Sequence, residues 1–555
     1  MPSKLIYLYG LAPCTGGLAF GYVSSLDTGS TSGILAMPQF LEYFNHPDNF
    51  QQGGITASIQ AGAFAGSLLT GAFLADRLGR KKTILLGSAL FTIGCAIACA
   101  ANGLPALVAG RVINGLGNGC LAMMVPLYQS EIAPREYAAA QPQGKKEKLT
   151  SRKNPRAYHL HAAVLHQFRY LARLLDTIRE PLSQRFGIVE TSTRLADGCK
   201  GSATIALHVT MYFLPESPRW LVAHDRQEEA GKVLAKLHAN GNTSDLYVQA
   251  ELAEIVAKIK YEKEHLSPSY ISLLFGNHAR RMWIGIGVQF WQQVTGINVI
   301  MYYAVFLFQQ AGIAGTQASL LANGIQGVIL NVITWINMWY IDSWGRRRPM
   351  IIGALGMAVS MMLIGVIMKT MGNPVYDALT QKTNFHFAQA SASHAAIAFV
   401  YIYVFWFALT WGCVAWVYPT EVFAMNMRGK GTSITSATNW FVNFWFALYI
   451  PTAMAKISWE LYMIFMAICV IIAITVYLFY PESAGKTLEE MDFLFSQGRS
   501  PWVFKDNEAT KVGALFERDM SHGEALTAFD EKMTSEKTVE DISQVQVVHV
   551  GEQAL

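Results

Sequence analysis

Long apolar runs alternate with short charged segments along most of this chain. A helix that crosses the hydrocarbon core of a membrane needs about 20 mostly apolar residues. Runs of this length predict ten membrane-spanning helices, four in the first half of the chain and six in the second. The fold class is therefore an all-α polytopic membrane protein. The predicted spans lie near 5–26, 54–75, 83–101, 104–128, 282–308, 317–340, 349–370, 395–424, 432–455 and 459–480.

Four segments lack such runs. Residues 137–203 hold 12 Lys/Arg against 5 Asp/Glu, and residues 204–214 are apolar over only half a span. Residues 225–265 alternate in charge at helical spacing, which predicts short cytosolic helices. The polar tail, 485–555, is predicted to be disordered.

Basic residues mark the cytoplasmic side of membrane proteins. The basic loops all fall on one side if both termini are cytoplasmic, as we expect for a multi-pass protein of the plasma membrane. These loops are 76–82, 134–200, 219–281, 342–348 and 427–430.

Composition supports this class and excludes others. Of the 555 residues, 52% are hydrophobic and 15% are charged, whereas soluble domains carry about 25% charge. A net charge of +4 predicts no nucleic-acid surface. The seven cysteines show no CxxC spacing, so no metal site or disulfide framework is expected. No zinc-protease motif or nucleophile elbow appears, so we expect neither an enzyme nor a cofactor.

The two halves of the chain echo each other. Gly79 and Gly345 lie in matching charged loops, and Pro215 and Pro481 begin matching Pro-Glu-Ser motifs; both pairs are 266 positions apart. Such a duplication indicates a transporter of two parallel halves with its substrate between them near mid-membrane. The predicted divisions are 1–136 (first bundle, four spans), 137–203 (basic segment), 204–280 (apolar remnant and cytosolic linker), 281–484 (second bundle, six spans) and 485–555 (tail).

Several motifs occur in a fixed order along the chain. They are 76–82, Gly110-Arg111, Gly115, Gly117, Gly119, Ser130-Glu131, 215–220, Gln292-Gln293, Gly296, Asn298 and 481–483. On these residues the chain resembles the sugar porter family of the major facilitator superfamily, its fungal hexose transporters in particular. The resemblance implies two pseudo-symmetric bundles, normally of twelve spans, and sugar transport by alternating access in a monomer. It also implies that the partners are a sugar, a proton and the lipid bilayer, with no nucleic acid.

The resemblance implies a sugar site built mainly of amides, whose donors and acceptors match those of hydroxyl groups. The aromatic members would place ring faces against the sugar. Interhelical hydrogen bonding remains the alternative for the amides, and plain packing the alternative for the tryptophans. The residues are Gln292, Gln293, Asn298, Asn331, Trp416, Asn439, Trp440 and Asn443.

Asp27 and Arg111 lie in the first and fourth predicted spans, and the resemblance implies that they couple transport to protons. Moving the guanidinium away would raise the pKa of the carboxyl group and let it take a proton. In the family the acid directly follows Phe-Gly-Tyr, whereas here residues 23–26 intervene. A static ion pair, a facilitative uniporter and a transporter-like sugar sensor remain alternatives.

Charged groups at the ends of the predicted spans are expected to form ion pairs that close the cytoplasmic face. They are Asp76, Arg77, Arg80, Glu131, Asp342, Arg346, Arg347, Glu421 and Arg428. Nearby, Cys413 stands where relatives commonly have proline, which leaves the bend of that span open.

Residues 137–203 depart from the repeat. Between Glu421 and Pro481 the second half has two spans, but between Glu131 and Pro215 the first half has none. Codons for the family's Arg-Gly continuation, read one base out of frame, encode the Tyr-Ala-Ala-Ala found at 137–140. We therefore predict that two helices have been replaced, through a frameshifted or mis-spliced gene model, and that the product transports poorly or not at all. A genuine cytoplasmic insertion is the alternative.

Overall fold

The structure is a computed structural model that describes residues 38–132, 204–302 and 316–484 with short gaps, and Met491 and Phe495. The gaps are 206, 240, 265–268, 277, 378–381, 388, 424–426 and 458. The predicted first span, the basic segment 137–203 and nearly all of the tail lie outside these residues. Residues 1–477 and 482–484 form one compact unit, which holds the helices below apart from the last two residues of α22. A second unit, 478–481 and 485–555, lies almost wholly outside the described residues.

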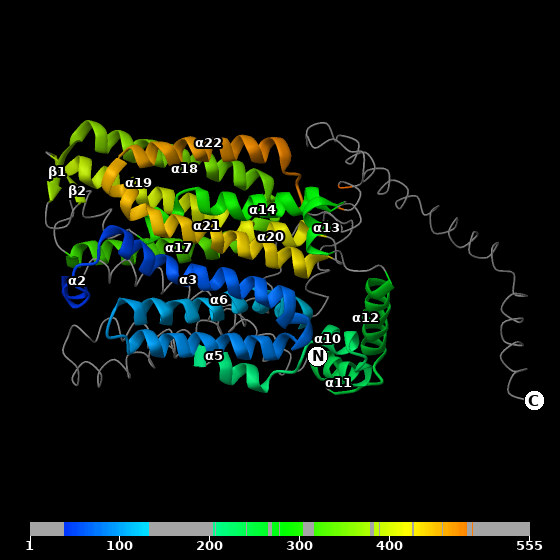
Figure 1. Ribbon diagram of the computed structural model, residues 1–555. Helices are drawn as coiled ribbons and strands as arrows, with labels where there is room; N and C mark the ends of the chain where they lie inside the picture. Colours follow the sequence, from blue (N-terminus) through cyan, green and yellow to red (C-terminus); the bar gives the residue numbers. More distant parts are fainter. Residues whose placement is uncertain are drawn as a thin grey trace, which may run out of the picture. The chain divides into compact units, whose positions relative to one another are not determined.

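Three long helices make up the first half (Figure 1). The predicted spans 54–75, 83–101 and 104–128 coincide with α3 and η1, α5 and α6. Asp48 and Gln51 begin α3 with a capping box, because each side chain accepts the other residue's backbone N–H. The elements are α2 (Pro38–Tyr43), α3 (Asn49–Leu69), the π-helix η1 (Thr70–Leu74), α4 (Ala75–Arg77), α5 (Arg80–Cys99) and α6 (Leu104–Ile132).

Glycines bring α3, α5 and α6 into backbone contact. A Cβ built on Gly62 would lie 2.1 Å from the carbonyl oxygen of Val112, and one on Gly117 would lie 2.4 Å from that of Gly87. Small residues permit this approach between helices in lipid, where packing and not hydrophobicity holds helices together.

The apolar remnant is docked against this bundle. Residues 207–213 are helical, and Leu207 and Met211 pack with Ile84 and Tyr128 in one buried cluster. The Oγ of Ser88 and Nδ1 of His208 are hydrogen-bonded at 2.8 Å. The half-length run therefore occupies a defined position beside α5.

Four helices follow, and two of them, α11 and α12, lie within 225–265, where the charge pattern predicted helices. Within them Trp220, Leu234 and Val248 form a separate buried core. On the exposed face of α11, Arg226 donates to Glu229 at 2.6 and 2.8 Å, and this hydrogen bond lowers the pKa of Glu229. The helices are α10 (Pro218–Ala223), α11 (Gln227–His238), α12 (Leu246–Glu264) and α13 (Tyr270–Phe275).

The six spans predicted in the second half are helical over their described residues, and the end of the first of them, 303–308, lies outside those residues. In the described part of the chain, four helical segments are long and apolar enough to cross a membrane by length and composition: Arg80–Cys99, Arg347–Met371, Ser391–Val422 and Glu460–Phe479. The helices of the second half are α14 (Ala279–Val294), α15 (Ile297–Tyr302), α17 (Thr316–Trp344), α18 (Arg347–Met371), α19 (Ala390–Leu409), α20 (Trp411–Val422), α21 (Arg428–Ile457) and α22 (Glu460–Phe479).

Two predicted spans are broken helices. Gly296, at φ +96°, separates α14 from α15, because glycine adopts this left-handed conformation without steric cost. Thr410, at φ −132° and ψ −81°, separates α19 from α20. A Cβ on Gly353 would lie 1.9 Å from the Thr410 hydroxyl, so the break is packed closely against α18. The bend left open by Cys413 is present without a proline at that position.

A two-stranded hairpin, β1 (Gly372–Asp377) and β2 (Lys382–Phe387), follows α18. The strands pair antiparallel, with Gly372 opposite Phe387 and Asp377 opposite Lys382. No element was predicted here, although β-branched and aromatic residues on both sides of a short connection favour a hairpin. This hairpin is the departure of the described residues from an all-α fold.

The two halves meet where α3 packs against α21 (Figure 1). A Cβ on Gly53 would lie 2.2 Å from the carbonyl oxygen of Leu448, so the backbones touch near the start of α3. Towards the other end, the Ser433 hydroxyl donates to the carbonyl oxygen of Ser67 at 2.9 Å. Contact between the halves therefore runs along most of both helices.

Candidate functional site

Buried amides converge beside the break between α14 and α15. The amide nitrogen of Gln292 donates to the carbonyl oxygen of Trp411 at 3.0 Å. The amide nitrogen of Asn439 donates to Oε1 of Gln292 at 2.8 Å and to Oε1 of Gln289 at 2.6 Å. Gln292 and Asn439 therefore join α14, α20 and α21 through hydrogen bonds within the protein.

Gln293 and Asn298 form a second pair. The Asn298 amide donates to Oε1 of Gln293 at 2.8 Å, across the break at Gly296. Both side chains are buried. The five-residue spacing places the two amides together because the helix ends between them.

Trp440 and Asn443, one turn apart on α21, each carry a buried polar atom that has no hydrogen-bond partner in the part of the chain that the structure describes. These atoms are the indole nitrogen of Trp440 and Oδ1 of Asn443. Leaving such a group unsatisfied costs about 1–3 kcal/mol. An indole N–H and an amide oxygen are thus available to a hydroxyl-bearing ligand at this place.

The structure does not bring every predicted sugar contact into this group. Asn331, on α17, is exposed, and its amide donates to the carbonyl oxygen of Gly327 in its own helix. Trp416 is half-buried on α20. The contacts of Asn331 and Trp416 therefore do not test the sugar-binding roles predicted for them, which stay predictions.

The predicted proton-coupling pair is described on one side only. Arg111 lies on α6 with its side chain buried. Asp27 lies outside the described residues, as do the four inserted positions 23–26.

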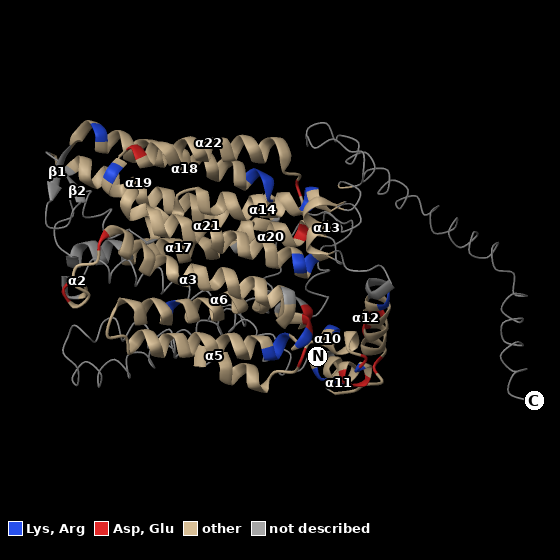
Figure 2. Ribbon diagram, viewed as in Figure 1, with Lys and Arg blue, Asp and Glu red and all other residues tan. Residues whose placement is uncertain are grey.

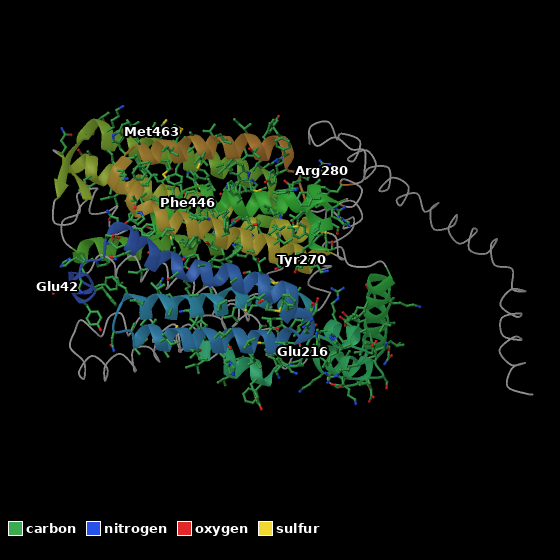
Figure 3. All side chains as sticks on the ribbon, in the orientation of Figure 1. Glu42, Glu216, Tyr270, Arg280, Phe446 and Met463 are labelled. Carbon is green, nitrogen blue, oxygen red and sulfur yellow. The ribbon has the colours of Figure 1, made fainter. Side chains whose placement is uncertain are left out.

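Charged side chains gather at one end of the bundle, beside α10–α13 (Figure 2). We refer to it as the charged end. Figure 3 shows Glu216, Tyr270 and Arg280 at this end and Glu42 at the opposite end. Two clusters of the same design occupy it.

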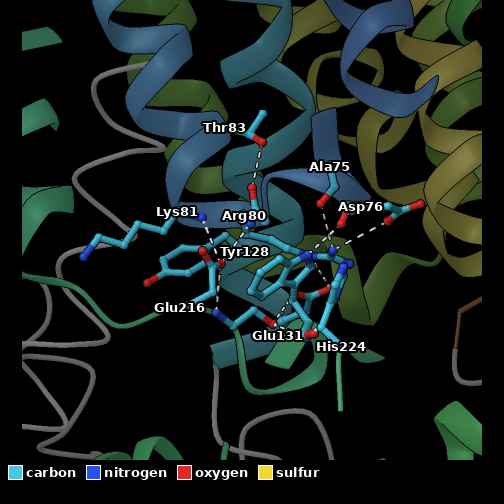
Figure 4. Close-up of polar contacts among 12 residues, drawn as sticks. Ala75, Asp76, Arg80, Lys81, Thr83, Tyr128, Glu131, Glu216 and His224 are labelled. Carbon is cyan, nitrogen blue, oxygen red and sulfur yellow. Dashed lines mark hydrogen bonds and ion pairs between the residues drawn. The ribbon is translucent and has the colours of Figure 1, made fainter. Parts of the chain in front are cut away.

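The first cluster is centred on Arg80, at the start of α5 (Figure 4). Its guanidinium binds Glu131 at 3.0 Å and donates to the carbonyl oxygen of Ala75 at 3.1 Å. The carboxylate of Glu216 accepts the backbone N–H groups of Arg80 and Lys81 at 2.9 and 3.0 Å. An anion thus lies at the N-terminus of α5, where free N–H groups and the helix dipole favour it.

The second cluster repeats these contacts at the start of α18. Arg346 binds Glu421 at 2.7 Å and donates to the carbonyl oxygen of Ile341 at 2.8 Å. Glu482 accepts the backbone N–H groups of Arg346 and Arg347 at 2.7 and 3.0 Å. The internal repeat is therefore reproduced contact by contact.

Each of these two ion pairs joins helices of one half. Arg80 and Glu131 both lie in the first half, and Arg346 and Glu421 both lie in the second. The pairs therefore brace the individual halves and do not themselves bridge them. The hydroxyl contact of Ser433 with Ser67 does join the halves.

The other predicted gating residues lie at the same end. Asp76 is largely exposed and 3.6 Å from Arg80, and the Arg77 guanidinium lies 5.7 Å above the ring of Phe73. Arg347 donates to the carbonyl oxygen of Tyr477. Arg428 begins α21 and Asp342 lies near the end of α17, where its side chain is not described.

Sequence reasoning missed several members of these networks. Gln289 lies three residues before Gln292, on the same face of α14, and that spacing was the available signal. Glu216 and Glu482 were noted as repeated motifs without a role. The buried Asn118 on α6 drew no attention because it stands among the glycines of that helix.

Comparison with known protein families identifies one match. The family model described as "Sugar (and other) transporter" matches residues 10–141 and 191–495. The unmatched interval lies within the basic segment 137–203.

Relatives and solved structures agree with that match. The chain is 32% identical over 524 residues to the high-affinity glucose transporter of Kluyveromyces lactis, covering 92% of this chain and 90% of the relative. It is 34% identical over 508 residues to the MFS glucose transporter mfs1 of Aspergillus flavus, covering 90% and 91%. The proton:xylose symporter XylE, solved with 6-bromo-6-deoxy-D-glucose bound, superposes with a TM-score of 0.65 at 27% identity, covering 89% of this chain and 100% of that one.

Proposed function

We propose that this chain, which belongs to the sugar transporter family of the major facilitator superfamily, has the architecture of a carrier that moves a monosaccharide, a hexose such as glucose, across the plasma membrane. Uptake by the chain as given is impaired by the two spans that are missing from 137–203. Transport proceeds by alternating access, with both chain termini and the charged end in the cytoplasm. The names of the fungal relatives, which are glucose transporters, support the substrate class.

The observation that carries the proposal is the pair of unsatisfied polar atoms on α21. The indole N–H of Trp440 and Oδ1 of Asn443 are buried and have no partner among the described residues, in the helix that also places Asn439 on the amides of α14. Broken helices at mid-membrane are where transporters of this kind bind substrate. Gln293 and Asn298, held together across such a break, are the further amides that we assign to the sugar.

The contacts between α3 and α21 account for the alternation. Gly53 against Leu448 and Ser67 against Ser433 lie towards opposite ends of the two helices. When the path for the sugar opens to one side of the membrane, the contact at that end of α3 and α21 separates and the contact at the other end is kept. The two arginine clusters keep each half rigid while this occurs.

Proton coupling is the finer part of the proposal. Arg111 is buried in α6, where a neighbouring carboxylate would be stabilised in its charged form. We assign that carboxylate to Asp27. Its protonation when Arg111 moves away would couple one proton to each sugar, and the neighbour XylE is itself named a proton:xylose symporter.

The test uses the purified full chain in nanodiscs and in proteoliposomes. Isothermal titration calorimetry measures the binding of D-glucose, D-xylose, maltose and, as an acyclic control, D-mannitol. We expect competition among the monosaccharides and weaker binding of maltose. Absence of monosaccharide binding would overturn the proposal. Sugar uptake that does not respond to an inward pH gradient would leave a uniporter, and sugar binding without uptake in any variant would favour a sensor.

A further inference from the structure

Asn118 is a buried polar residue to which the proposed function assigns no role. Its side chain lies on α6 and is 3% exposed. Its Oδ1 has no hydrogen-bond partner among the described residues. A buried amide oxygen without a hydrogen bond lowers the stability of the protein, unless a bound molecule donates a hydrogen bond to it.

Its neighbours along the helix fix the direction in which Asn118 points. Gly117 packs against α5, where a Cβ would lie 2.4 Å from the carbonyl oxygen of Gly87. Gly119 packs against α3, where a Cβ would lie 2.2 Å from the carbonyl oxygen of Ala63. Successive residues of a helix are turned by about 100°, so Asn118 points away from both neighbouring helices.

The opposite side of α6 confirms this direction. Cys120 is turned by about 200° from Asn118, and its thiol contacts the carbonyl oxygen of Gly66 on α3 at 3.8 Å. A Cβ on Gly87 of α5 would lie 3.0 Å from the Cβ of Cys120. α3 and α5 therefore meet over Cys120, on the side of α6 remote from Asn118.

The side that Asn118 faces is where the second half reaches the first. Ala122, one turn along α6 on the same face, packs with Ala63 and with Trp440 of α21 in one buried cluster. The Trp440 indole N–H is itself without a partner. An unsatisfied acceptor on the first half and an unsatisfied donor on the second thus lie towards the same part of the boundary between the halves.

The geometry points to Asn118 as a specificity-determining sugar contact supplied by the first half: its Oδ1 accepts the O–H of one sugar hydroxyl. This inference rests on the proposed function and deepens it, since the sugar contacts assigned so far all come from the second half. A ligand held by Trp440 and Asn443 on one side and Asn118 on the other would join the halves directly. Sugar hydroxyls suit this role because each is both donor and acceptor.

The experiment measures the Kd of D-glucose and of each of its monodeoxy analogues by calorimetry, using the full chain and its Asn118→Leu variant. Asn114→Leu is the matched control, because Asn114 is also a buried amide on α6 with an unpartnered Oδ1. Its amide nitrogen, however, donates to Sγ of Cys95 on α5 at 3.3 Å.

We expect Asn118→Leu to raise the Kd for glucose by about 3- to 10-fold, the effect of one neutral hydrogen bond. One deoxy analogue, which lacks the hydroxyl bound by Asn118, should bind the full chain more weakly than glucose but bind the variant as well as glucose does. Asn114→Leu should preserve the discrimination of the full chain against every analogue.

Other outcomes overturn the inference. An unchanged Kd in Asn118→Leu would mean that water alone satisfies Oδ1, and an equal rise for every analogue would mean that Asn118 acts only through packing. If Asn118→Leu fails to elute as a folded particle, Asn118→Ala, which adds no bulk, is measured in the same way. No glucose binding by the unmodified chain would instead overturn the proposed function, and Asn118's role with it.

Discussion

The carboxylate of Glu216 accepts the backbone N–H of Arg80 at 2.9 Å, across 136 residues of chain. Glu482 accepts the backbone N–H of Arg346 across the same separation, at 2.7 Å. In the first half this separation includes the basic segment 137–203. The contacts of the first cluster are therefore all present among the described residues, even though residues 137–203, between Glu131 and Glu216, depart from the repeat.

We predict that Glu216→Gln destabilises the first half. The substitution removes an anion from the N-terminus of α5 and weakens two charge-assisted hydrogen bonds, for an expected loss of about 1–3 kcal/mol. The measurement is the melting temperature of the purified protein. Glu228→Gln is the control, because Glu228 forms only an exposed pair with Lys232; equal melting temperatures for the two variants would contradict the prediction.

Gly79→Ala should also destabilise the protein. Gly79 has φ +88°, and an added Cβ would lie 2.8 Å from Oε2 of Glu216. The left-handed conformation alone costs alanine roughly 1–2 kcal/mol. In the control Gly54→Ala the Cβ meets nothing within 4 Å on α3, so thermal unfolding should show a neutral or slightly raised melting temperature. A neutral Gly79→Ala would show that this turn can relax.

The amides of α14 should separate into two classes. Gln293→Ala and Asn298→Ala should raise the apparent Km or Kd for sugar strongly at unchanged surface expression, since each removes hydrogen bonds worth roughly 0.5–1.5 kcal/mol or more. Gln292→Ala should chiefly lower the melting temperature, because it removes one of the two acceptors of the Asn439 amide and the Gln292 donor to the carbonyl oxygen of Trp411. Sugar affinity unchanged in both of the first two variants would remove Gln293 and Asn298 from the site.

Asp27→Asn should abolish accumulation of sugar against a gradient and the accompanying alkalinisation, while exchange of sugar across the membrane survives. The reason is that an amide cannot carry the coupled proton. Labelled-sugar accumulation with and without a protonophore is the measurement. Uphill uptake by the unmodified chain that ignores the protonophore would contradict the symport mechanism.

The chain as given should transport poorly or not at all, because the sequence between Glu131 and Pro215 lacks the two spans that the repeat predicts for the first bundle. Replacing 137–203 by the corresponding segment of the Kluyveromyces lactis relative should restore uptake in a cell that lacks its own hexose transporters. Robust, saturable uptake by the unmodified chain would show that the missing spans are dispensable. Sequencing the transcript would separate a gene-model fault from a genuine insertion.

Much of the fold could be predicted because each membrane-spanning helix requires a long apolar run that is visible in the sequence. The break at Gly296 could also be anticipated, since Gln293 and Asn298 share a face only if the helix ends between them. The break at Thr410 could not, because it depends on the close approach of Gly353 from another helix. The hairpin at 372–387 could not be predicted from helical periodicity, because side chains in a strand alternate with a period of two residues.

The sequence predicted which residue types form the site, but not which of these residues hydrogen-bond to which helices. Nothing in the sequence distinguishes Gln292, whose amide bonds to α20 and α21, from Gln293, one position later, whose amide bonds to Asn298 across the break. That difference arises from which side of α14 faces α20 and α21. Likewise, the charged residues were identified from the repeat, but only the contacts show that Arg80 and Arg346 each pair within their own half.

The docking of Glu216 on α5 bears on how the chain enters the membrane during synthesis. By holding the end of the remnant at the charged end, this contact returns the polypeptide to the side from which α5 began. If residues 137–203 replace two spans, as we predict, an even number of crossings is lost, and α14 and the helices after it keep the orientation that they have in the family.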